Sequence, residues 1–318
     1  MNETATMQPP EKLVEVTGLT KKFGEHTAVT DLSFTVNRGD IYGFLGQNGA
    51  GKSTTIRMLL SLVRPTSGEI RMMGQPLNTH RNEILRQVGA VIEKPDLYKY
   101  LSGYENLSLF ARLSGVNANR RVLMDQLEQV GLADRAKDKF RTYSQGMKQR
   151  LGIAVALIHN PALIILDEPT NGLDPQGIAD MRRLILQLAR EQGKTIVISS
   201  HLLYEIEQLA TRMIIIHKGR KIVEGSVAGL LDPTKTLVRL EATEKEKART
   251  LLGNSQWSAQ LQQKIELQLI MNRAEVPALI HHCVSAGIEL LSVNTSHTLE
   301  NYFLSLTNQS EHAHIAAD

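Results

Sequence analysis

The chain has 318 residues, of which 42% are hydrophobic, and its formal net charge is +3. This length can bury one large core plus a smaller one, while the nearly balanced charge, without any run of five or six like charges, argues against a nucleic-acid-binding arm. The single cysteine, Cys283, excludes an intrachain disulfide and favours a reducing compartment.

The N-terminal residues 1–12 form a polar extension that lacks the apolar segment of a signal peptide. The longest apolar runs, LIIL before Asp167 and MIII from Met213, are far too short to span a bilayer. We therefore expect that nothing in this chain crosses a membrane by itself.

From residue 13 to residue 230, short apolar runs alternate with segments of helical period, which is the pattern of an α/β domain with a buried sheet. Residues 97–160 contain only helical patterns, and they predict a helical insertion within this domain. The candidate strands are 13–19, 33–36, 40–46, 69–73, 88–93, 162–167, 194–200 and 212–217.

A glycine-rich loop follows the strand 40–46 and precedes a helical run. Glycines let such a loop fold tightly, so that its N–H groups and the helix N-terminus point at phosphate oxygens. Lys52 adds a positive charge toward the β- and γ-phosphates, and the Ser53 hydroxyl is placed for Mg²⁺. The predicted nucleotide-binding residues of this loop are Gly46, Gln47, Asn48, Gly49, Ala50, Gly51, Lys52, Ser53 and Thr54.

The strand 88–93 ends on a carboxylate, Glu93, just before a turn at Lys94-Pro95. A carboxylate at a strand end is usually a solvated edge, and this is the first interpretation of Glu93. Tyrosines then gather close behind the turn, either as an interface patch or as part of the helical core. These tyrosines are Tyr98, Tyr100 and Tyr104, next to Leu97 and Leu101.

The motif Tyr143-Ser-Gln-Gly-Met147 leads into a helical run. A small hydroxyl residue and a glycine at a helix start leave N–H groups free, which predicts a second anion-binding helix end. The earlier triplet at 101–103 is rejected as a similar motif, because Tyr104 replaces the needed glycine and Ser102 with Glu105 indicates a capping box.

The strand 162–167 delivers Asp167, and Glu168 follows directly. A buried strand that ends on a carboxylate brings an Asp to the outer shell of the same Mg²⁺, and the next acid can polarise an attacking water. His201 stands at the end of the strand 194–200, where it can bond the γ-phosphate and hold the water in line, although a lone histidine is more often structural.

After residue 231 the pattern changes to a small α+β module over residues 232–307, followed by a polar tail, 308–318. Strands are expected at 236–242, 264–271 and 288–293, and helices at 274–287 and 298–306. The helix 274–287 should bury one stripe made of Val276, Leu279, Ile280, Cys283 and Val284. Adjacent His281 and His282 point about 100° apart on a helix, so shared metal ligation is not expected.

Over residues 13–225 the chain resembles the ATP-binding subunits of ABC transporters, because the P-loop 46–53, the signature 143–147, the acid strand 163–168, the segment 171–174 and His201 occur in that family's order. The signature departs from the usual Leu-Ser-Gly-Gly-Gln but keeps Ser144 and Gly146, which the resemblance places at the γ-phosphate. The resemblance implies a RecA-like P-loop core, ATP and Mg²⁺ as cofactors, and ATP hydrolysis coupled to transport.

The resemblance also implies an assembly. Since each motif occurs once, two copies or a close relative must pair around two ATP molecules, most simply as a homodimer. The pair would drive separate integral membrane permease subunits from the cytoplasmic face of the cell membrane. In the nucleotide site the resemblance adds Asp174 and the ring of Phe23, which would stack on adenine; a core phenylalanine is the alternative.

ABC subunits usually carry Gln at the position of Glu93, where it senses Mg²⁺ and water and passes the change to the membrane subunit. A Glu there, with this signature and a C-terminal module, resembles the subgroup of bacitracin- and lantibiotic-immunity exporters. The resemblance therefore adds Glu93 to Ser53 and Asp167 as a metal-site residue, and makes the tyrosine patch a docking surface.

The predicted function is ATP-driven export of an antimicrobial peptide or antibiotic, with export of another small molecule, ion or polymer as the alternative. Soluble ABC ATPases that act on ribosomes or DNA carry two ATPase units or a long coiled coil between the motifs, and this chain has neither. No nucleic-acid partner is therefore expected. An inactive binding module is opposed by Glu168 and His201.

Overall fold

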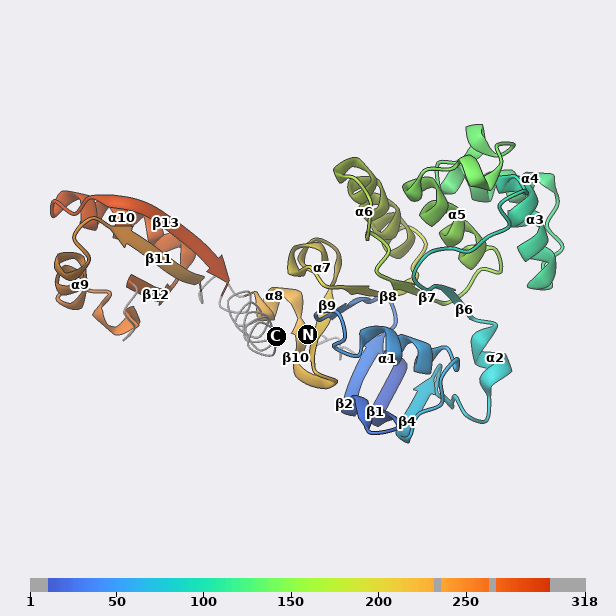
Figure 1. The fold of residues 1–318 in the computed structure, drawn as a ribbon, viewed down its shortest axis with the longest axis horizontal. Helices are drawn as coiled ribbons and strands as arrows, with labels where there is room; N and C mark the ends of the chain where they lie inside the picture. The colour runs from blue at the N-terminus through green and yellow to red at the C-terminus, as the bar shows by residue number, and fades with distance from the viewer. Residues whose placement is uncertain (1–10, 232–235, 263–266, 298–318) are drawn as a thin grey trace, which may run out of the picture. The chain divides into compact units, whose positions relative to one another are not determined.

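The computed structural model describes residues 11–231, 236–262 and 267–297. It divides into two compact units, residues 1–225 and 226–318, so the division falls just before the expected domain end at residue 230 (Figure 1). The expected helix 298–306 and the polar tail lie outside the described residues. Across the described ranges, no helix has the length and apolar character needed to span a membrane.

The first unit contains a six-stranded sheet in the order β10-β9-β3-β8-β7-β6. Its neighbouring pairs β9·β3, β3·β8, β8·β7 and β7·β6 are parallel, as expected for buried apolar strands joined by helices. The strands are β3 (Ile41–Leu45), β6 (Val88–Val91), β7 (Leu163–Asp167), β8 (Thr195–Ser200), β9 (Arg212–His217) and β10 (Arg220–Ser226). The strand β6 ends at Val91, so Glu93 lies in the following turn rather than on the predicted strand 88–93.

A second, four-stranded sheet has the order β2-β1-β4-β5 with antiparallel pairs. Its strands are β1 (Lys12–Phe23), β2 (His26–Asn37), β4 (Ser67–Met72) and β5 (Gln75–Pro76). Together with α1 (Lys52–Leu59), this sheet shares one hydrophobic core with alternate residues of the six-stranded sheet, such as Tyr42 and Phe44 of β3 and Ile214 and Ile216 of β9. The alternation follows from the two-residue period of a strand.

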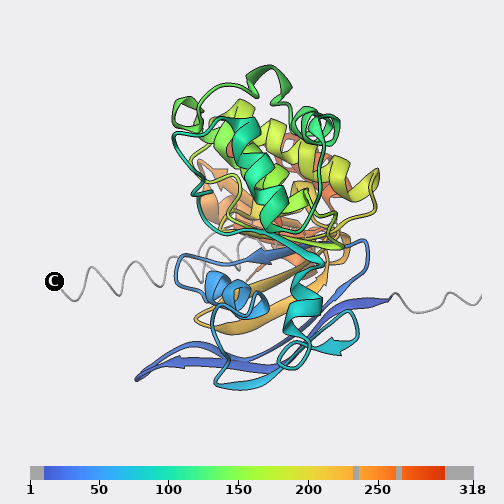
Figure 2. The same cartoon turned by 90° about the vertical axis from the view of Figure 1, so that its right-hand side faces the viewer.

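Helices cover the other face of the six-stranded sheet. Seen from the side, α1 and the four-stranded sheet lie below the six-stranded sheet and the helices of the insertion lie above it (Figure 2). Gly43 of β3 shows how closely this upper layer packs, because a Cβ there would come within 2.5 Å of the Ile206 side chain on α7. The helices of this layer are α3 (Gly103–Leu113), α4 (Arg120–Gln129), α5 (Gln145–Leu157), α6 (Pro175–Arg190) and α7 (Leu203–Leu209). The short helix α2 (Arg81–Leu85) lies on the other side, where Ile84 belongs to the core shared with the four-stranded sheet.

The start of α3 confirms the expected capping box. The Ser102 hydroxyl accepts from the Glu105 N–H, and the Glu105 carboxylate accepts from the Ser102 N–H. These residues therefore begin a helix within the insertion, as a capping box does elsewhere.

The second unit is built on a three-stranded antiparallel sheet in the order β12-β11-β13. Its core includes Leu240, Leu269, Leu279, Cys283 and Trp257. Its elements are α8 (Val227–Leu230), β11 (Thr236–Ala242), α9 (Lys245–Gly253), β12 (Leu267–Met271), α10 (Val276–Ser285) and β13 (Leu290–His297).

The predicted apolar stripe of the helix 274–287 is wrong at one position. Val276, Leu279 and Cys283 are buried, but Val284 is 58% exposed. Val284 lies one position beyond Cys283 and five beyond Leu279, so the helical period turns it away from the sheet. The buried stripe is therefore narrower than the run of apolar letters suggests.

Candidate functional site

Three sequence motifs meet at one edge of the six-stranded sheet. The P-loop follows β3, Asp167 ends β7, and His201 follows β8. Because β3, β8 and β7 are adjacent and parallel, their carboxyl ends lie side by side. Open parallel sheets bind ligands at this edge, so the topology places the predicted residues where a nucleotide would bind.

The P-loop has the tight backbone that its glycines predict. Gly51 has φ +101°, a conformation that L side chains rarely adopt, and a Cβ there would lie 2.7 Å from the Ala28 carbonyl oxygen. The same loop leads directly into α1, and no side chain in the described part of the chain caps that helix. Its first N–H groups are thus left for a ligand, as at other phosphate-binding helix starts.

The Lys52 side chain is buried within the P-loop. Its amine donates to the carbonyl oxygens of Gly46 at 2.5 Å and Gln47 at 3.2 Å. The same nitrogen lies 3.1 Å from Glu168 Oε1, with side-chain exposures of 5% and 17%. The P-loop and the acid strand are therefore in direct electrostatic contact.

Glu168 lies between two cationic or donor groups. Its Oε2 is 2.9 Å from His201 Nδ1, while its Oε1 faces Lys52. Its backbone has φ +50°, which is uncommon for a residue with a side chain and is found where the surrounding structure enforces it, often at functional sites. The Glu168 N–H donates to Ser199 Oγ at 2.8 Å, and this bond holds the turn.

Asp167 presents one oxygen that has no partner. Ser199 donates its hydroxyl to Asp167 Oδ1 at 2.6 Å, but the buried Oδ2 has no hydrogen-bond partner among the described residues. A buried carboxylate oxygen without a partner is costly unless a cation or donor completes it. The donor set at this edge therefore fits a hard cation such as Mg²⁺, which prefers oxygen ligands.

The signature residues lie in a separate hollow. A cavity of about 400 Å³ is lined by Ser144, Gln145 and Gly146 together with Gly172 and Asp174, and the lining includes no P-loop residue. Ser144 caps α5 by accepting from the Met147 N–H at 3.3 Å, and the Asp174 carboxylate caps α6 by accepting from the Gly177 N–H at 3.0 Å. The signature therefore lies beside Asp174, whereas the P-loop contacts Glu168 at the end of the acid strand.

The unusual tyrosine of the signature has a packing role. Tyr143 is 3% exposed, its hydroxyl donates to the Arg135 carbonyl oxygen at 2.7 Å, and burial raises the pKa of this phenol. A Cβ at Gly103 would meet that hydroxyl, so the glycine lets the ring approach α3. Within the helical insertion, Tyr143 therefore anchors the signature to the start of α3 and to the segment around Arg135.

Two predicted residues lie on the surface. The Phe23 ring is 50% exposed with Lys21 Nζ 4.8 Å above it, so it is not a core residue. The Glu93 carboxylate is 64% exposed and forms an ion pair with Arg57 of α1. The Glu93 carbonyl oxygen also accepts from Gln149 of α5 at 3.4 Å, which links the P-loop helix and the signature helix at this turn.

The tyrosine patch is displayed on a well-anchored segment. Tyr98 and Tyr100 are 56% and 80% exposed, whereas Leu97 beside them is buried. The buried Asn106 side chain accepts from the Tyr98 N–H and donates to the Tyr98 and Ser102 carbonyl oxygens. These bonds fix the backbone that carries the exposed rings.

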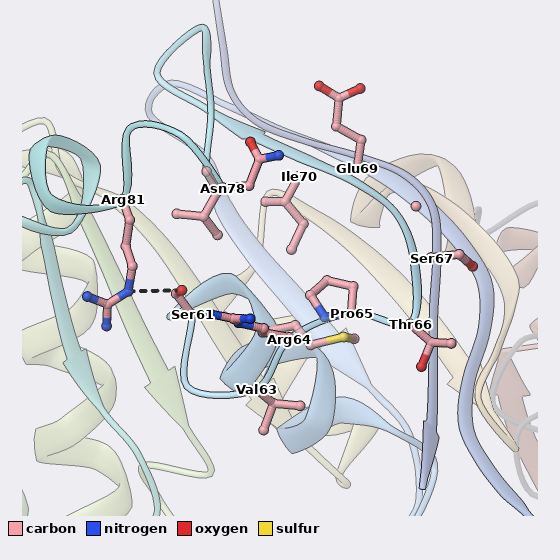
Figure 3. Close-up of a pocket in the computed structure, with 13 residues that line it drawn as sticks. Ser61, Val63, Arg64, Pro65, Thr66, Ser67, Glu69, Ile70, Asn78 and Arg81 are labelled. Atoms are coloured by element: carbon pink, nitrogen blue, oxygen red, sulfur yellow. Dashed lines mark hydrogen bonds between the residues drawn. The ribbon is translucent and has the colours of Figure 1, made fainter. Parts of the chain in front are cut away.

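A further cavity of about 460 Å³ lies beside the C-terminal end of α1 (Figure 3). Arg81 Nε donates to Ser61 Oγ at 3.0 Å across it, and Arg64 and Glu69 also line it. Its lining contains none of the predicted site residues. It is therefore distinct from the nucleotide edge of the sheet.

Sequence reasoning did not identify the hydroxyl residues that hold this edge together. Ser199 bridges Asp167 and Glu168, while Ser200 and Thr170 both donate to Glu205. One signal was available: two serines end the otherwise apolar strand 194–200, and buried hydroxyl groups need partners. The identity of those partners depends on strand order, which a single sequence does not show.

Comparisons with known proteins agree with the geometry. A family described as "ABC transporter" matches residues 29–171. The bacitracin transport ATP-binding protein BcrA of Bacillus licheniformis is 42% identical over 92% of this chain and 97% of its own length. The lantibiotic transport ATP-binding protein SrtF of Streptococcus pyogenes is 41% identical over 68% of this chain and 92% of its own. A solved dimeric structure of a post-hydrolysis state of the ATP-binding cassette MJ0796, bound to ADP and Pi, is 27% identical with a TM-score of 0.62. The match covers 68% of this chain and 99% of that chain.

Proposed function

Because the chain belongs to the ATP-binding proteins of ABC transporters and is an ATPase whose hydrolysis is coupled to transport, we propose that it powers the export of an antimicrobial peptide or antibiotic. The predicted family and the predicted P-loop ATPase fold are confirmed by the relatives and the structural neighbours. The observation that carries the cargo proposal is the similarity to BcrA over nearly the whole of both chains.

The contacts at the sheet edge support a division of roles. We assign Glu168 as the group that polarises the attacking water and accepts its proton, and His201 as the group that orients it. Both are supported by their direct contact at 2.9 Å. When ATP arrives, Lys52 exchanges carbonyl and Glu168 contacts for phosphate oxygens, which leaves Glu168 free to face the water.

Mg²⁺ is proposed as the metal cofactor, held by Ser53 and by the unpartnered Oδ2 of Asp167. Within the described residues no group of three or more His, Cys, Asp or Glu could hold a metal alone. This fits Mg²⁺, which is usually bound through one or two carboxylates and the substrate phosphates. When bound, it neutralises charge on the β- and γ-phosphates.

We also propose that two copies of this chain close around two ATP molecules. The support is that the cavity lined by Ser144 and Gly146 includes no P-loop residue, so the nucleotide edge of one copy needs a signature from elsewhere. Each motif occurs once in the sequence, so a second copy is the simplest source. Phe23 would stack on the adenine of the ATP bound by its own chain.

The exposed tyrosines beside Glu93 support a docking site for a permease. Aromatic residues are enriched in interface cores, and Tyr98 and Tyr100 are held on a fixed backbone. The permease would then place this chain on the cytoplasmic face of the membrane. The C-terminal unit carries none of the phosphate motifs, and we propose that it regulates or tethers.

The test is to express the chain in a bacitracin-sensitive bacterium together with each candidate permease found among the genes next to its own. We expect the two proteins to purify as one complex and the host to survive higher concentrations of bacitracin or a lantibiotic. The Glu168→Gln variant should form the same complex without protecting the cell. A complex that hydrolyses ATP but protects against neither compound would refute the cargo, and failure to copurify would refute the permease.

A further inference from the structure

A buried carboxylate joins the two segments that carry Glu168 and His201. Glu205 of α7 is 7% exposed, and its Oε2 accepts from Ser200 Oγ at 2.6 Å and from Thr170 Oγ1 at 2.8 Å. Ser200 is fully buried and Thr170 is 5% exposed. One oxygen atom thus holds two hydroxyl groups that come from different loops.

Each hydroxyl lies close to a proposed catalytic residue. Ser200 directly precedes His201, and its Oγ also accepts from the Leu202 N–H at 3.0 Å, so it holds the chain on both sides of the histidine. Thr170 lies two residues after Glu168, in the turn where the Asn171 N–H donates to the Glu168 carbonyl oxygen. A shift of either loop would therefore change the contact between His201 and Glu168.

We propose that Glu205 is a positioning residue for ATP hydrolysis, which fixes the His201 loop against the Glu168 turn through its two hydroxyl partners. The proposal rests on the proposed roles of Glu168 and His201. Glu205 itself acts only through these two loops, so its effect should fall on turnover and not on nucleotide binding.

Packing alone does not explain a carboxylate at this position. The neighbouring buried residues of α7 are Leu203, Ile206 and Leu209, and an apolar side chain would complete that face at lower desolvation cost. A carboxylate oxygen can accept both hydroxyls, whereas an apolar replacement would leave two buried donors unpaired. The residue type therefore matches the bonding requirement of the two loops.

Comparing Glu205→Gln with Glu205→Ala shows whether the hydrogen bonds of Glu205 matter for turnover. In Glu205→Gln the amide oxygen can still accept both hydroxyls, so we expect kcat within about threefold of the parent. In Glu205→Ala both bonds are lost, and misplacement of the His201 loop should lower kcat by about 10- to 100-fold. The Kd for ATP should change less than twofold in both. Gln208→Ala, an exposed position on the same helix, is the control and should behave as the parent.

The decisive experiment is a double-mutant cycle on the full chain, with kcat, Kd for ATP and melting temperature measured for Glu205→Ala, His201→Ala and the double variant. Because Glu205 is proposed to act through the His201 contact, adding Glu205→Ala to His201→Ala should cost less than about threefold more. The proposal would be overturned if Glu205→Ala lowers kcat by the same 10- to 100-fold in the His201→Ala protein as in the parent. It would also be overturned if kcat is unchanged in Glu205→Ala alone. If His201→Ala turns over as the parent does, it is the assigned role of His201 that fails.

A second variant tests the positioning role of Glu205 if the Glu205→Ala protein does not fold. If Glu205→Ala does not fold, Ser200→Ala removes the Ser200 bonds to Glu205 and Leu202 while the Thr170 bond remains. This variant should show lower kcat with unchanged Kd for ATP. A folded Ser200→Ala protein with the parental kcat would contradict the proposal.

Discussion

The turn between β6 and the helical insertion gives a prediction about Glu93. Its carboxylate pairs with Arg57 Nη2 at 2.5 Å, and the two side chains are 64% and 43% exposed. We propose that Glu93 leaves Arg57 and contacts Mg²⁺ or its water when two copies close around ATP. The variants Glu93→Gln, Glu93→Ala and Arg57→Ala test this.

The exposure of the pair determines its contribution to stability. Ion pairs between exposed side chains contribute about 0 to 1 kcal/mol, which is a shift of about 2 to 4 °C at most in a domain of this size. All three variants should therefore fold and bind ATP as the parent does. Glu69→Gln is a matched control, because Glu69 pairs with Arg71 at 3.3 Å with exposures of 57% and 44%.

The expected effect on metal dependence is larger. Hydrogen bonds to charged groups contribute about 1.5 to 3 kcal/mol and neutral ones about 0.5 to 1.5, so losing the charge should cost about 1 to 1.5 kcal/mol. This raises the Mg²⁺ concentration for half-maximal ATPase activity by roughly 5- to 10-fold in Glu93→Gln. Arg57→Ala should lower this Mg²⁺ concentration, because the substitution frees the Glu93 carboxylate from its ion pair. Glu93→Ala should uncouple hydrolysis from transport more severely, because no side-chain oxygen remains.

The assay is ATPase activity across a Mg²⁺ titration, with and without the permease, for the parent, the three variants and the control. Thermal melting of each protein shows that folding is unchanged. If Glu93→Gln and Glu93→Ala match the parent in every condition, Glu93 is a solvated carboxylate after a strand, and the comparison with immunity exporters loses one of its supports.

Three further predictions concern the P-loop and the C-terminal unit. Gly51→Ala should lower ATP affinity, measured by equilibrium binding, at least tenfold, because it combines backbone strain of about 1 to 3 kcal/mol with a clash against Ala28. The control is Gly39→Ala, which has φ +82° but no atom within 4 Å of the added Cβ and should bind ATP normally. A chain cut near Leu231 should still bind ATP, and a folded truncation that does not would show that the C-terminal unit builds the site. Burial raises the pKa of the Cys283 thiol, so a thiol reagent should label it only after unfolding; rapid labelling of the native chain would contradict the packing of α10.

The sequence indicates the P-loop, Asp167, Glu168 and His201 as candidate site residues, because each depends on a local pattern of a strand followed by a few polar residues, and the structure places all of them at one edge of the sheet. It did not predict that Glu168 would contact both Lys52 and His201. Those contacts follow from the order β3-β8-β7, which places strands distant in the sequence next to each other.

Other features escaped prediction because their local signals are weak. The edge strand β10 carries the sequence RKIVEGS, in which three charged residues and a glycine obscure the alternation of a strand. Glu205 resembles any other acid on an amphipathic helix until the loops of Ser200 and Thr170 are in place. Val284 extends an apolar run whose helical period points it to solvent.

The most direct test of the ATPase site is the state of Glu168→Gln in the presence of Mg²⁺ and ATP. Removing a general base costs about 10² to 10⁴ in rate, while the amide of Gln keeps the size of the side chain. We predict that analytical ultracentrifugation finds this variant as a pair of chains, with one unhydrolysed ATP retained per chain. Turnover at the parental rate would contradict the role of Glu168, and a monomer saturated with ATP would contradict the closure of two copies around two nucleotides.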